Sequence, residues 1–323
     1  MKTKHIFWGF IIGLFFVTHA QQKIHDDFEP QLFEINGYNI NIETRGSGEP
    51  IVFIAGGPGD SHDYLQGNFG AYYKNNQVIF FDGLGRGLSD DAKNLNEYSI
   101  ATDVEILEGI RKVLDLEQWS IVGHSYGTVV AQAYALKYPK KVSKMVLING
   151  FHSGLMWQAN CDSYNRYART HFPLIWKKID SLRHKGYISR DSIFAEVYGS
   201  LPVKYVYYHD TKLKQPMPKK VKRSWNSDVY YGIVGDDADF HVAGSMGAID
   251  FRKQLVLIQS PTLVIAGRYD GVSTPEFAVQ YQQYMPQARF EMFEASGHNP
   301  YLEEPEKFFR IFDQFLEIKK QEK

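Results

Sequence analysis

The sequence has a single cysteine, Cys161, so it cannot form an internal disulfide and must rely on a hydrophobic core for stability. Lysine and arginine (36 residues) nearly balance aspartate and glutamate (37 residues), and this balance gives no indication of nucleic acid as a partner. The sequence contains no H-E-x-x-H motif and no Cys/His cluster, so we expect neither a metal nor a cofactor. Its 323 residues, 44% of them hydrophobic, are typical of a globular protein with a large core.

No apolar run reaches the roughly 20 residues that a membrane-spanning helix needs. The run at residues 6–17 follows Lys2 and Lys4 and precedes small residues up to Ala20, which is the layout of a secretory signal peptide. We therefore predict a signal peptide over residues 1–20 and an exported protein, periplasmic or secreted, without a stable membrane span after cleavage. An uncleaved N-terminal anchor is the alternative.

Strand and helix signals alternate along the first half of the chain. The pair Asn36-Gly37, between two alternating apolar runs, predicts a β-hairpin. Solid apolar runs then predict strands buried on both faces, at residues 51–54, 77–81, 119–122 and 142–148. Helical periodicity between them, at residues 100–114 and 130–138, predicts an α/β fold with a mostly parallel sheet flanked by helices.

This alternation is interrupted in the middle of the chain. Residues 151–255 are rich in aromatic and basic side chains and show little strand signal, whereas strand patterns return at residues 261–266 and 290–293. An amphipathic pattern over residues 304–318 predicts a closing helix. The simplest division is an α/β core over residues 21–150 and 256–323 with an inserted helical cap over residues 151–255.

The strongest chemical motif is Gly123-His124-Ser125-Tyr126-Gly127, which fits the pattern G-x-S-x-G. It lies between a predicted buried strand and a predicted helix, where a sharp turn would present the serine hydroxyl above the sheet. We interpret Ser125 as a nucleophile; a glycine-rich turn without catalytic function is the alternative.

A serine hydroxyl needs a general base, and the base needs a group to orient it. Asp270 follows the predicted strand 261–266, and His298 lies in the loop after the predicted strand 290–293. The chain order serine, acid, histidine is that of serine hydrolases with this motif. The sequence therefore predicts a Ser125–His298–Asp270 triad that acts through an acyl-enzyme.

An acyl-transfer site also needs backbone donors for the oxyanion. One should be the N–H of Tyr126, directly after the nucleophile. The loop Gly56-Gly57-Pro58-Gly59 should supply the other, and we expect it to be the Gly57 N–H because proline has none.

With these motifs the sequence resembles the prolyl aminopeptidase (proline iminopeptidase) branch of the α/β-hydrolase superfamily, from about Phe33 to Leu316. The Gly-Gly-Pro-Gly loop is the most branch-specific feature, and Asp82 through Ser89, Gly123 through Gly127, Gly267 through Asp270 and Gly297-His298 also match. The resemblance implies an α/β-hydrolase fold, a helical cap over the site, and release of an N-terminal residue, often proline, from a short peptide.

The sequence departs from the branch at Ala55, at Gly83-Leu84 and at Gly271, where some members carry a glutamate that binds the substrate ammonium. Carboxylates in the cap are the other candidates for that role, and we predict Asp239 and Glu196 as substrate-binding residues. A carboxylesterase or lactonase with the same triad is the alternative function, and a binding protein without turnover is a third. In each case we expect a small-molecule or short-peptide ligand.

Overall fold

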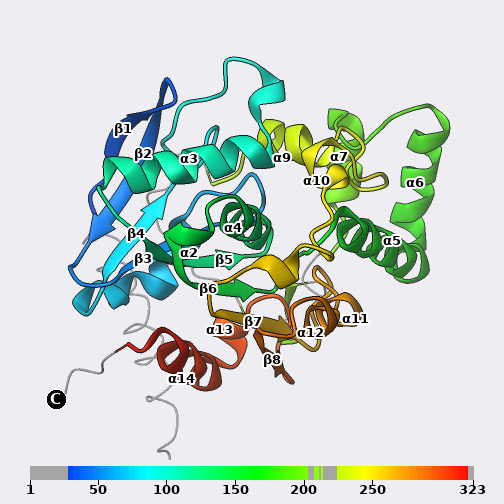
Figure 1. Cartoon of the computed structure of the whole chain (residues 1–323). Helices are drawn as coiled ribbons and strands as arrows, with labels where there is room; N and C mark the ends of the chain where they lie inside the picture. Colours follow the sequence, from blue (N-terminus) through cyan, green and yellow to red (C-terminus); the bar gives the residue numbers. More distant parts are fainter. Residues whose placement is uncertain (1–27, 203–206, 211, 214–223, 319–323) are drawn as a thin grey trace, which may run out of the picture.

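The computed structural model describes residues 28–202, 207–210, 212–213 and 224–318. The predicted signal peptide, residues 1–20, lies outside these residues. Eight strands form one sheet in the order β1-β2-β4-β3-β5-β6-β7-β8 (Figure 1). Their bounds are Gln31–Ile35, Tyr38–Arg45, Pro50–Ile54, Gln77–Phe81, Trp119–His124, Val142–Ile148, Thr262–Gly267 and Arg289–Phe293 for β1 to β8.

The sheet is mostly parallel, as the alternation of strand and helix predicts. β1 and β2 form the predicted hairpin, and the turn residues Asn36 and Gly37 have φ values of 53° and 81°, a conformation that favours this Asn-Gly pair. β2 also pairs antiparallel with β4, whereas all other neighbouring strands are parallel. The prediction of an α/β-hydrolase type of sheet is confirmed.

Helices cover both faces of the sheet because its central strands are apolar on both sides. Along β3, Val52 and Ile54 pack with α3 (Ile100–Val113) and α4 (Tyr126–Lys137), whereas the alternate residues Ile51 and Phe53 belong to a second cluster. That second cluster includes α2 (Asp63–Phe69), α13 (Pro300–Glu303) and α14 (Pro305–Leu316). The shorter helices α11 (Pro275–Ala278) and α12 (Tyr281–Tyr284) join the first cluster.

Between β6 and β7, within the segment where the sequence predicts a helical insertion, the described residues include the helices α5 (Gly154–His171), α6 (Pro173–His184), α7 (Ser192–Gly199), α9 (Ser227–Val234) and α10 (Gly244–Ala248). The first three share an apolar cluster of their own around Trp176, Ile179 and Phe194, away from the sheet. α9 and α10 instead pack on the main core through Val229, Ile233 and Met246. Short 3-10 helices cover Gly70–Lys74, Leu95–Glu97, Pro139–Lys141 and Leu255–Leu257.

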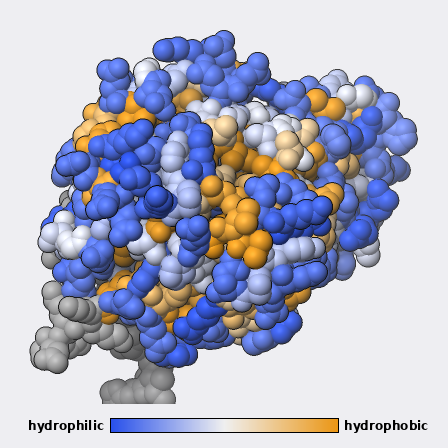
Figure 2. Space-filling view, viewed as in Figure 1, coloured by the Kyte–Doolittle hydropathy of each residue, from blue (hydrophilic) through white to orange (hydrophobic). Residues whose placement is uncertain are grey.

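Hydrophilic side chains cover most of the face drawn in Figure 2, with a group of hydrophobic side chains near its centre. Within the described part of the chain, every helix is too short or too polar to cross a membrane.

Candidate active site

Ser125 lies at the sharp turn between β5 and α4, in the backbone conformation φ 54°, ψ −123°. A non-glycine residue adopts a positive φ only where the surrounding structure holds it there. Small neighbours permit this turn: a Cβ atom at Gly127 would lie 2.2 Å from the Ile54 carbonyl oxygen, and one at Gly56 would lie 2.9 Å from the Ser125 Cβ. The glycines of both motifs therefore let the oxyanion loop and the nucleophile turn approach each other.

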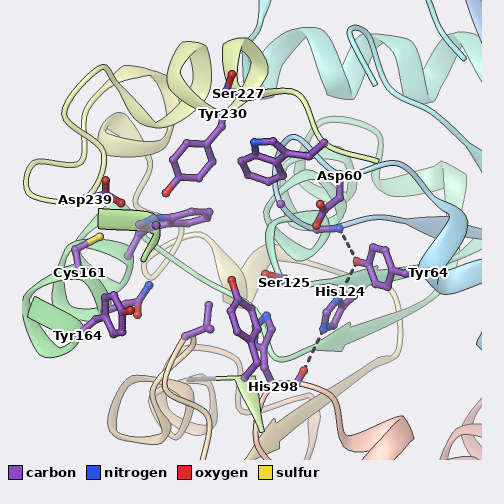
Figure 3. A pocket seen from close by; sticks show the side chains of 18 of the residues that line it. Asp60, Tyr64, His124, Ser125, Cys161, Tyr164, Ser227, Tyr230, Asp239 and His298 are labelled. Atoms are coloured by element: carbon purple, nitrogen blue, oxygen red, sulfur yellow. Dashed lines mark hydrogen bonds between the residues drawn. The ribbon is translucent and has the colours of Figure 1, made fainter. Parts of the chain in front are cut away.

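Asp270 and His298 come together from the loops that follow β7 and β8. The Nδ1 of His298 lies 2.8 Å from Oδ2 of Asp270, and both residues are buried. The other carboxylate oxygen of Asp270 accepts the backbone N–H groups of Val272 and Ser273, at 2.7 and 2.9 Å. His298 and Ser125 line the same cavity (Figure 3), and Asp270 contacts His298, so the structure brings the three predicted triad residues together.

Asn149, which the sequence analysis does not single out, belongs to this site. Its Nδ2 donates to Oδ2 of Asp270 at 2.6 Å and to the carbonyl of Gly297 at 3.0 Å, so one fully buried amide joins the two loops that carry Asp270 and His298. Its position directly after β6, at the carboxyl edge of the parallel sheet, is the signal that would have identified it.

The two predicted oxyanion donors lie close to Ser125, since Tyr126 follows it in the chain and Gly57 lines the same cavity. Neither the Gly57 N–H nor the Tyr126 N–H makes a hydrogen bond to another residue in the described ranges. The adjacent Gly56 N–H is already used, because it donates to the Tyr64 hydroxyl at 2.7 Å. The arrangement is therefore consistent with Gly57 and Tyr126 as the groups that face an incoming acyl oxygen.

A chain of hydrogen bonds connects the oxyanion loop to His298 (Figure 3). The Tyr64 hydroxyl lies 2.8 Å from Nδ1 of His124, and Nε2 of His124 lies 3.1 Å from the His298 carbonyl oxygen. A carbonyl only accepts, so Nε2 of His124 carries the proton and Nδ1 accepts from Tyr64. Burial, with the nearby His298, lowers the pKa of His124 to about 3, which keeps this imidazole neutral.

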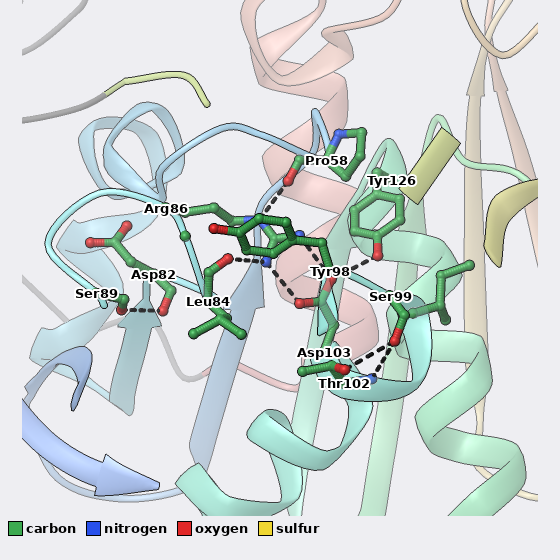
Figure 4. A network of polar contacts seen from close by, with 12 residues as sticks. Pro58, Asp82, Leu84, Arg86, Ser89, Tyr98, Ser99, Thr102, Asp103 and Tyr126 are labelled. Atoms are coloured by element: carbon green, nitrogen blue, oxygen red, sulfur yellow. Dashed lines mark hydrogen bonds and ion pairs between the residues drawn. The ribbon is translucent and has the colours of Figure 1, made fainter. Parts of the chain in front are cut away.

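A second network holds the two sides of the oxyanion region together (Figure 4). Arg86 binds both carboxylate oxygens of Asp103, at 2.7 and 2.8 Å, and its Nε donates to the Pro58 carbonyl. The Tyr126 hydroxyl donates to the same Asp103 carboxylate at 2.7 Å. Arg86 belongs to the Asp82–Ser89 motif, so this motif acts structurally by connecting the Gly-Gly-Pro-Gly loop to the residue after the nucleophile.

The cavity beside Ser125 has a volume of about 630 Å³ and lies between the sheet and the cap helices. Aromatic side chains make up much of its wall: Tyr64, Trp157, Tyr164, Tyr198, Tyr207, Tyr208, Trp225, Tyr230 and Tyr231. Two carboxylates line it, Asp60 and Asp239, and none of the described lining residues is a lysine or an arginine. The cavity thus favours a ligand that is apolar in part and positively charged.

Both cavity carboxyl groups have raised pKa values. Burial raises the pKa of Asp239 to about 6, although a hydrogen bond from Ser189 opposes the rise. Burial raises the pKa of Asp60 to about 7, against the opposing charges of Arg86 and His298. Carboxyl groups of this kind gain stability when a cation enters and pairs with them.

The structure does not bring Glu196 to the cavity. Its side chain is exposed on α7, whereas the neighbouring residues Ala195, Tyr198 and Gly199 line the wall. Asp60, which the sequence analysis passed over, occupies the cavity instead; its place directly after the Gly-Gly-Pro-Gly loop was the available signal.

Cys161 is buried at the cavity wall, and burial raises its thiol pKa to about 12, which opposes thiolate formation. Within the ranges that the structure describes, no group of three or more His, Cys, Asp or Glu residues is arranged to hold a metal ion.

Residues 49–305 match the family model described as alpha/beta hydrolase fold. The chain is 31% identical to a proline iminopeptidase of Heyndrickxia coagulans over 85% of this chain and 93% of the relative. It is 29% identical to a proline iminopeptidase of Saccharolobus solfataricus over 95% of this chain and 97% of the relative. The crystal structure of a Mycobacterium smegmatis proline iminopeptidase has a TM-score of 0.72 at 19% identity, with 90% of this chain and 98% of that chain covered.

The chain therefore belongs to the α/β-hydrolase fold family, and it is a hydrolase. The predicted similarity to the proline iminopeptidase branch is confirmed.

Proposed function

We propose that the protein is a serine hydrolase in which Ser125 is the nucleophile, His298 the general base and Asp270 the residue that orients the base. The observation that supports it most directly is the 2.8 Å contact between His298 Nδ1 and Asp270 beside the strained turn at Ser125. With Nδ1–H donated to the carboxylate, Nε2 of His298 is free to accept the serine proton.

The reaction follows from this placement. Ser125 Oγ attacks the acyl carbonyl and passes its proton to His298, while the oxygen that gains charge is stabilised by the N–H groups of Gly57 and Tyr126. His298 then gives the proton to the leaving group, and an acyl-enzyme remains on Ser125. Water attacks this ester, with His298 again as base, and releases the acid.

We further propose that the leaving group is the remainder of a short peptide, and that the acyl group is an N-terminal residue of the proline type. The relatives named above are proline iminopeptidases, and the cavity offers carboxylates but no described cationic side chain. A free N-terminal ammonium fits such a cavity, because an unpaired carboxylate recessed in an aromatic wall is costly. Asp239, from the cap, is the sequence-predicted partner for this ammonium.

A carboxylesterase or lactonase is the second candidate. It is favoured by Gly271, which cannot supply the acidic side chain found at this place in some similar enzymes, and by the position of Glu196 outside the cavity. The same triad would serve, without an ammonium site.

The deciding experiment compares hydrolysis of proline p-nitroanilide and p-nitrophenyl acetate by the wild type, Ser125→Ala and Ser227→Ala. Ser227 also lines the cavity and serves as the matched control for loss of a serine hydroxyl. Anilide cleavage that disappears only in Ser125→Ala supports the aminopeptidase. Ester cleavage alone supports the second candidate. Activity of Ser125→Ala equal to that of the wild type on both substrates rejects the triad.

We also propose export, on the basis of the layout of residues 1–20. Fractionation of expressing cells would place the full chain outside the cytoplasm and a chain lacking residues 1–20 inside it. Equal partition of the two chains would reject the proposal.

A further inference from the structure

Asp60 is the cavity carboxyl that lies beside the reacting centre. It follows Gly57 by three residues, and its Cγ lies 3.2 Å from the position that a Cβ atom would take on Gly57. The side chain thus folds back over the peptide whose N–H is the proposed oxyanion donor. Figure 3 shows Asp60 on the opposite side of the pocket from Asp239, with Ser125 between them.

The backbone holds Asp60 in this place. Asp60 forms an antiparallel bridge with Trp225, and the flanking residues Gly59 and Ser61 exchange backbone hydrogen bonds with Asn226 and Ser224, at 3.0 and 3.2 Å. The oxyanion loop is therefore joined to the segment that begins cap helix α9, so Asp60 has a fixed position between core and cap.

Among the described residues, the cationic groups whose charges act on Asp60 are Arg86 and His298, and both are committed to other carboxylates. Arg86 binds Asp103 through two nitrogens, and His298 binds Asp270. Within the described residues, the Asp60 carboxyl makes no hydrogen bond or ion pair, although it faces the cavity. A carboxylate in this environment lacks a partner, and a cationic ligand would supply one.

The proposed reaction also favours a cation here. An ionised carboxylate beside the oxyanion hole would oppose the negative charge that develops on the substrate oxygen. In a substrate with a free N-terminus, one carbon atom separates the amino nitrogen from the scissile carbonyl carbon. The ammonium of such a substrate must lie next to the oxyanion hole once its carbonyl is in place, which is where Asp60 lies.

We propose that Asp60, on the oxyanion loop, binds the α-ammonium of the substrate and thereby selects acyl groups with a free N-terminus. This inference rests on the proposed aminopeptidase function and assigns its ammonium site to the core, beside Gly57. Asp239 interacts with cap groups, among them Ser189 and Asp237, rather than with the triad. The bound ammonium neutralises Asp60, so the free N-terminus removes a repulsion that would otherwise act on the oxyanion.

The test measures binding of two small ligands to the inactive Ser125→Ala protein by calorimetry. Prolinamide carries the ammonium in its ring, and cyclopentanecarboxamide is the analogue of the same ring size in which a carbon replaces that nitrogen. Ratios of their dissociation constants are compared in Ser125→Ala alone and after adding Asp60→Asn or Asp239→Asn. The two asparagine variants remove a cavity carboxylate each, so they are matched controls for one another.

We expect Asp60→Asn to reduce the preference for prolinamide about tenfold or more, the scale of a lost charge-assisted hydrogen bond, and Asp239→Asn to leave it nearly unchanged. An unchanged preference in Asp60→Asn, or a loss confined to Asp239→Asn, overturns the assignment. Asp60→Ser, with a melting curve for every variant, provides a second carboxylate deletion if Asp60→Asn does not fold.

The outcome is separable from that of the proposed function. If the wild type leaves proline p-nitroanilide intact, and the preference for prolinamide depends on Asp60, the ammonium site is supported and the peptidase function is rejected. If the wild type cleaves the anilide, but its preference for prolinamide does not depend on Asp60, the peptidase function is supported and Asp60 as the ammonium site is rejected.

Discussion

Arg86 and Asp103 form a buried ion pair, with both guanidinium–carboxylate contacts shorter than 3 Å, at the meeting point of the two loops that carry the proposed oxyanion donors. Arg86 fixes the Pro58 carbonyl on one side, and Asp103 fixes the Tyr126 hydroxyl on the other. Neither residue lines the cavity beside Ser125, so we expect the pair to affect catalysis mainly by positioning the two loops.

We predict that Asp103→Asn lowers kcat about 10–100-fold on amide and ester substrates alike, with little change in KM, because displaced donors stabilise the oxyanion less well. Steady-state kinetics on one substrate of each kind measure the effect. The control is Glu108→Gln, since Glu108 makes a comparable bidentate pair with Arg111 and accepts from the Tyr134 hydroxyl, away from the cavity. Equal kcat losses in the two variants would contradict a positioning role for Asp103.

Asn149 gives a second prediction. Asn149→Ala removes the amide that holds both the Asp270 carboxylate and the Gly297 carbonyl. We expect kcat to fall about tenfold and the free energy of unfolding to fall by about 1–3 kcal/mol, because two buried acceptors lose a donor.

Gln132→Ala is the matched control for Asn149, since the Gln132 amide also donates to two buried carbonyls, those of Thr128 and Phe151. Urea unfolding together with initial rates separates the two effects. We expect a similar loss of stability in both variants, with kcat reduced only in Asn149→Ala. An equal reduction of kcat in both variants would show that Asn149 has only a structural role.

A third prediction concerns the dependence of stability on pH. His62 is buried between Asp82 and Glu43, with its Nδ1 2.8 Å from Asp82 and its Nε2 3.4 Å from Glu43. Burial alone would lower its pKa, but the charges of both carboxylates and the hydrogen bond with Asp82 raise it well above its ordinary value. The folded state therefore keeps a proton that the unfolded state releases, so this stabilisation is complete below about pH 6.5 and is lost as pH rises toward the folded pKa.

We expect the free energy of unfolding to fall between about pH 6.5 and pH 9 in the wild type, and to fall less in His62→Gln. Denaturant titrations across this range measure the difference. His152→Gln is the control of opposite sign, because burial lowers the His152 pKa to about 4, so its contribution is lost only as pH falls below about 6.5. Identical pH slopes above 6.5 in the wild type and His62→Gln would exclude a charged His62.

The sequence predicts the sheet and three residues of the candidate site because both depend on local patterns. Apolar runs define the buried strands, and Ser125, Asp270 and His298 each follow a strand, so the edge of a parallel sheet gathers them. Asn149 also directly follows a strand, β6, but its contacts with Asp270 and Gly297 and the pairing of Arg86 with Asp103 on α3 depend on the tertiary fold and could not be predicted from local patterns. The sequence could not predict that Glu196 is exposed, since its exposure depends on how α7 is oriented within the cap.

The final prediction uses the raised pKa values of the cavity carboxyl groups. Asp239 and Asp60, with pKa values of about 6 and about 7, ionise as pH rises through this range, and only the ionised forms attract a cationic substrate. We expect kcat/KM for proline p-nitroanilide, relative to that for p-nitrophenyl acetate, to increase between about pH 5.5 and pH 8. The ratio removes the contribution of the proposed base His298, which would serve both substrates. In Asp60→Asn the rise should largely disappear, whereas Asp239→Asn should retain most of it. A ratio independent of pH in the wild type would show that neither carboxylate meets the substrate's charge.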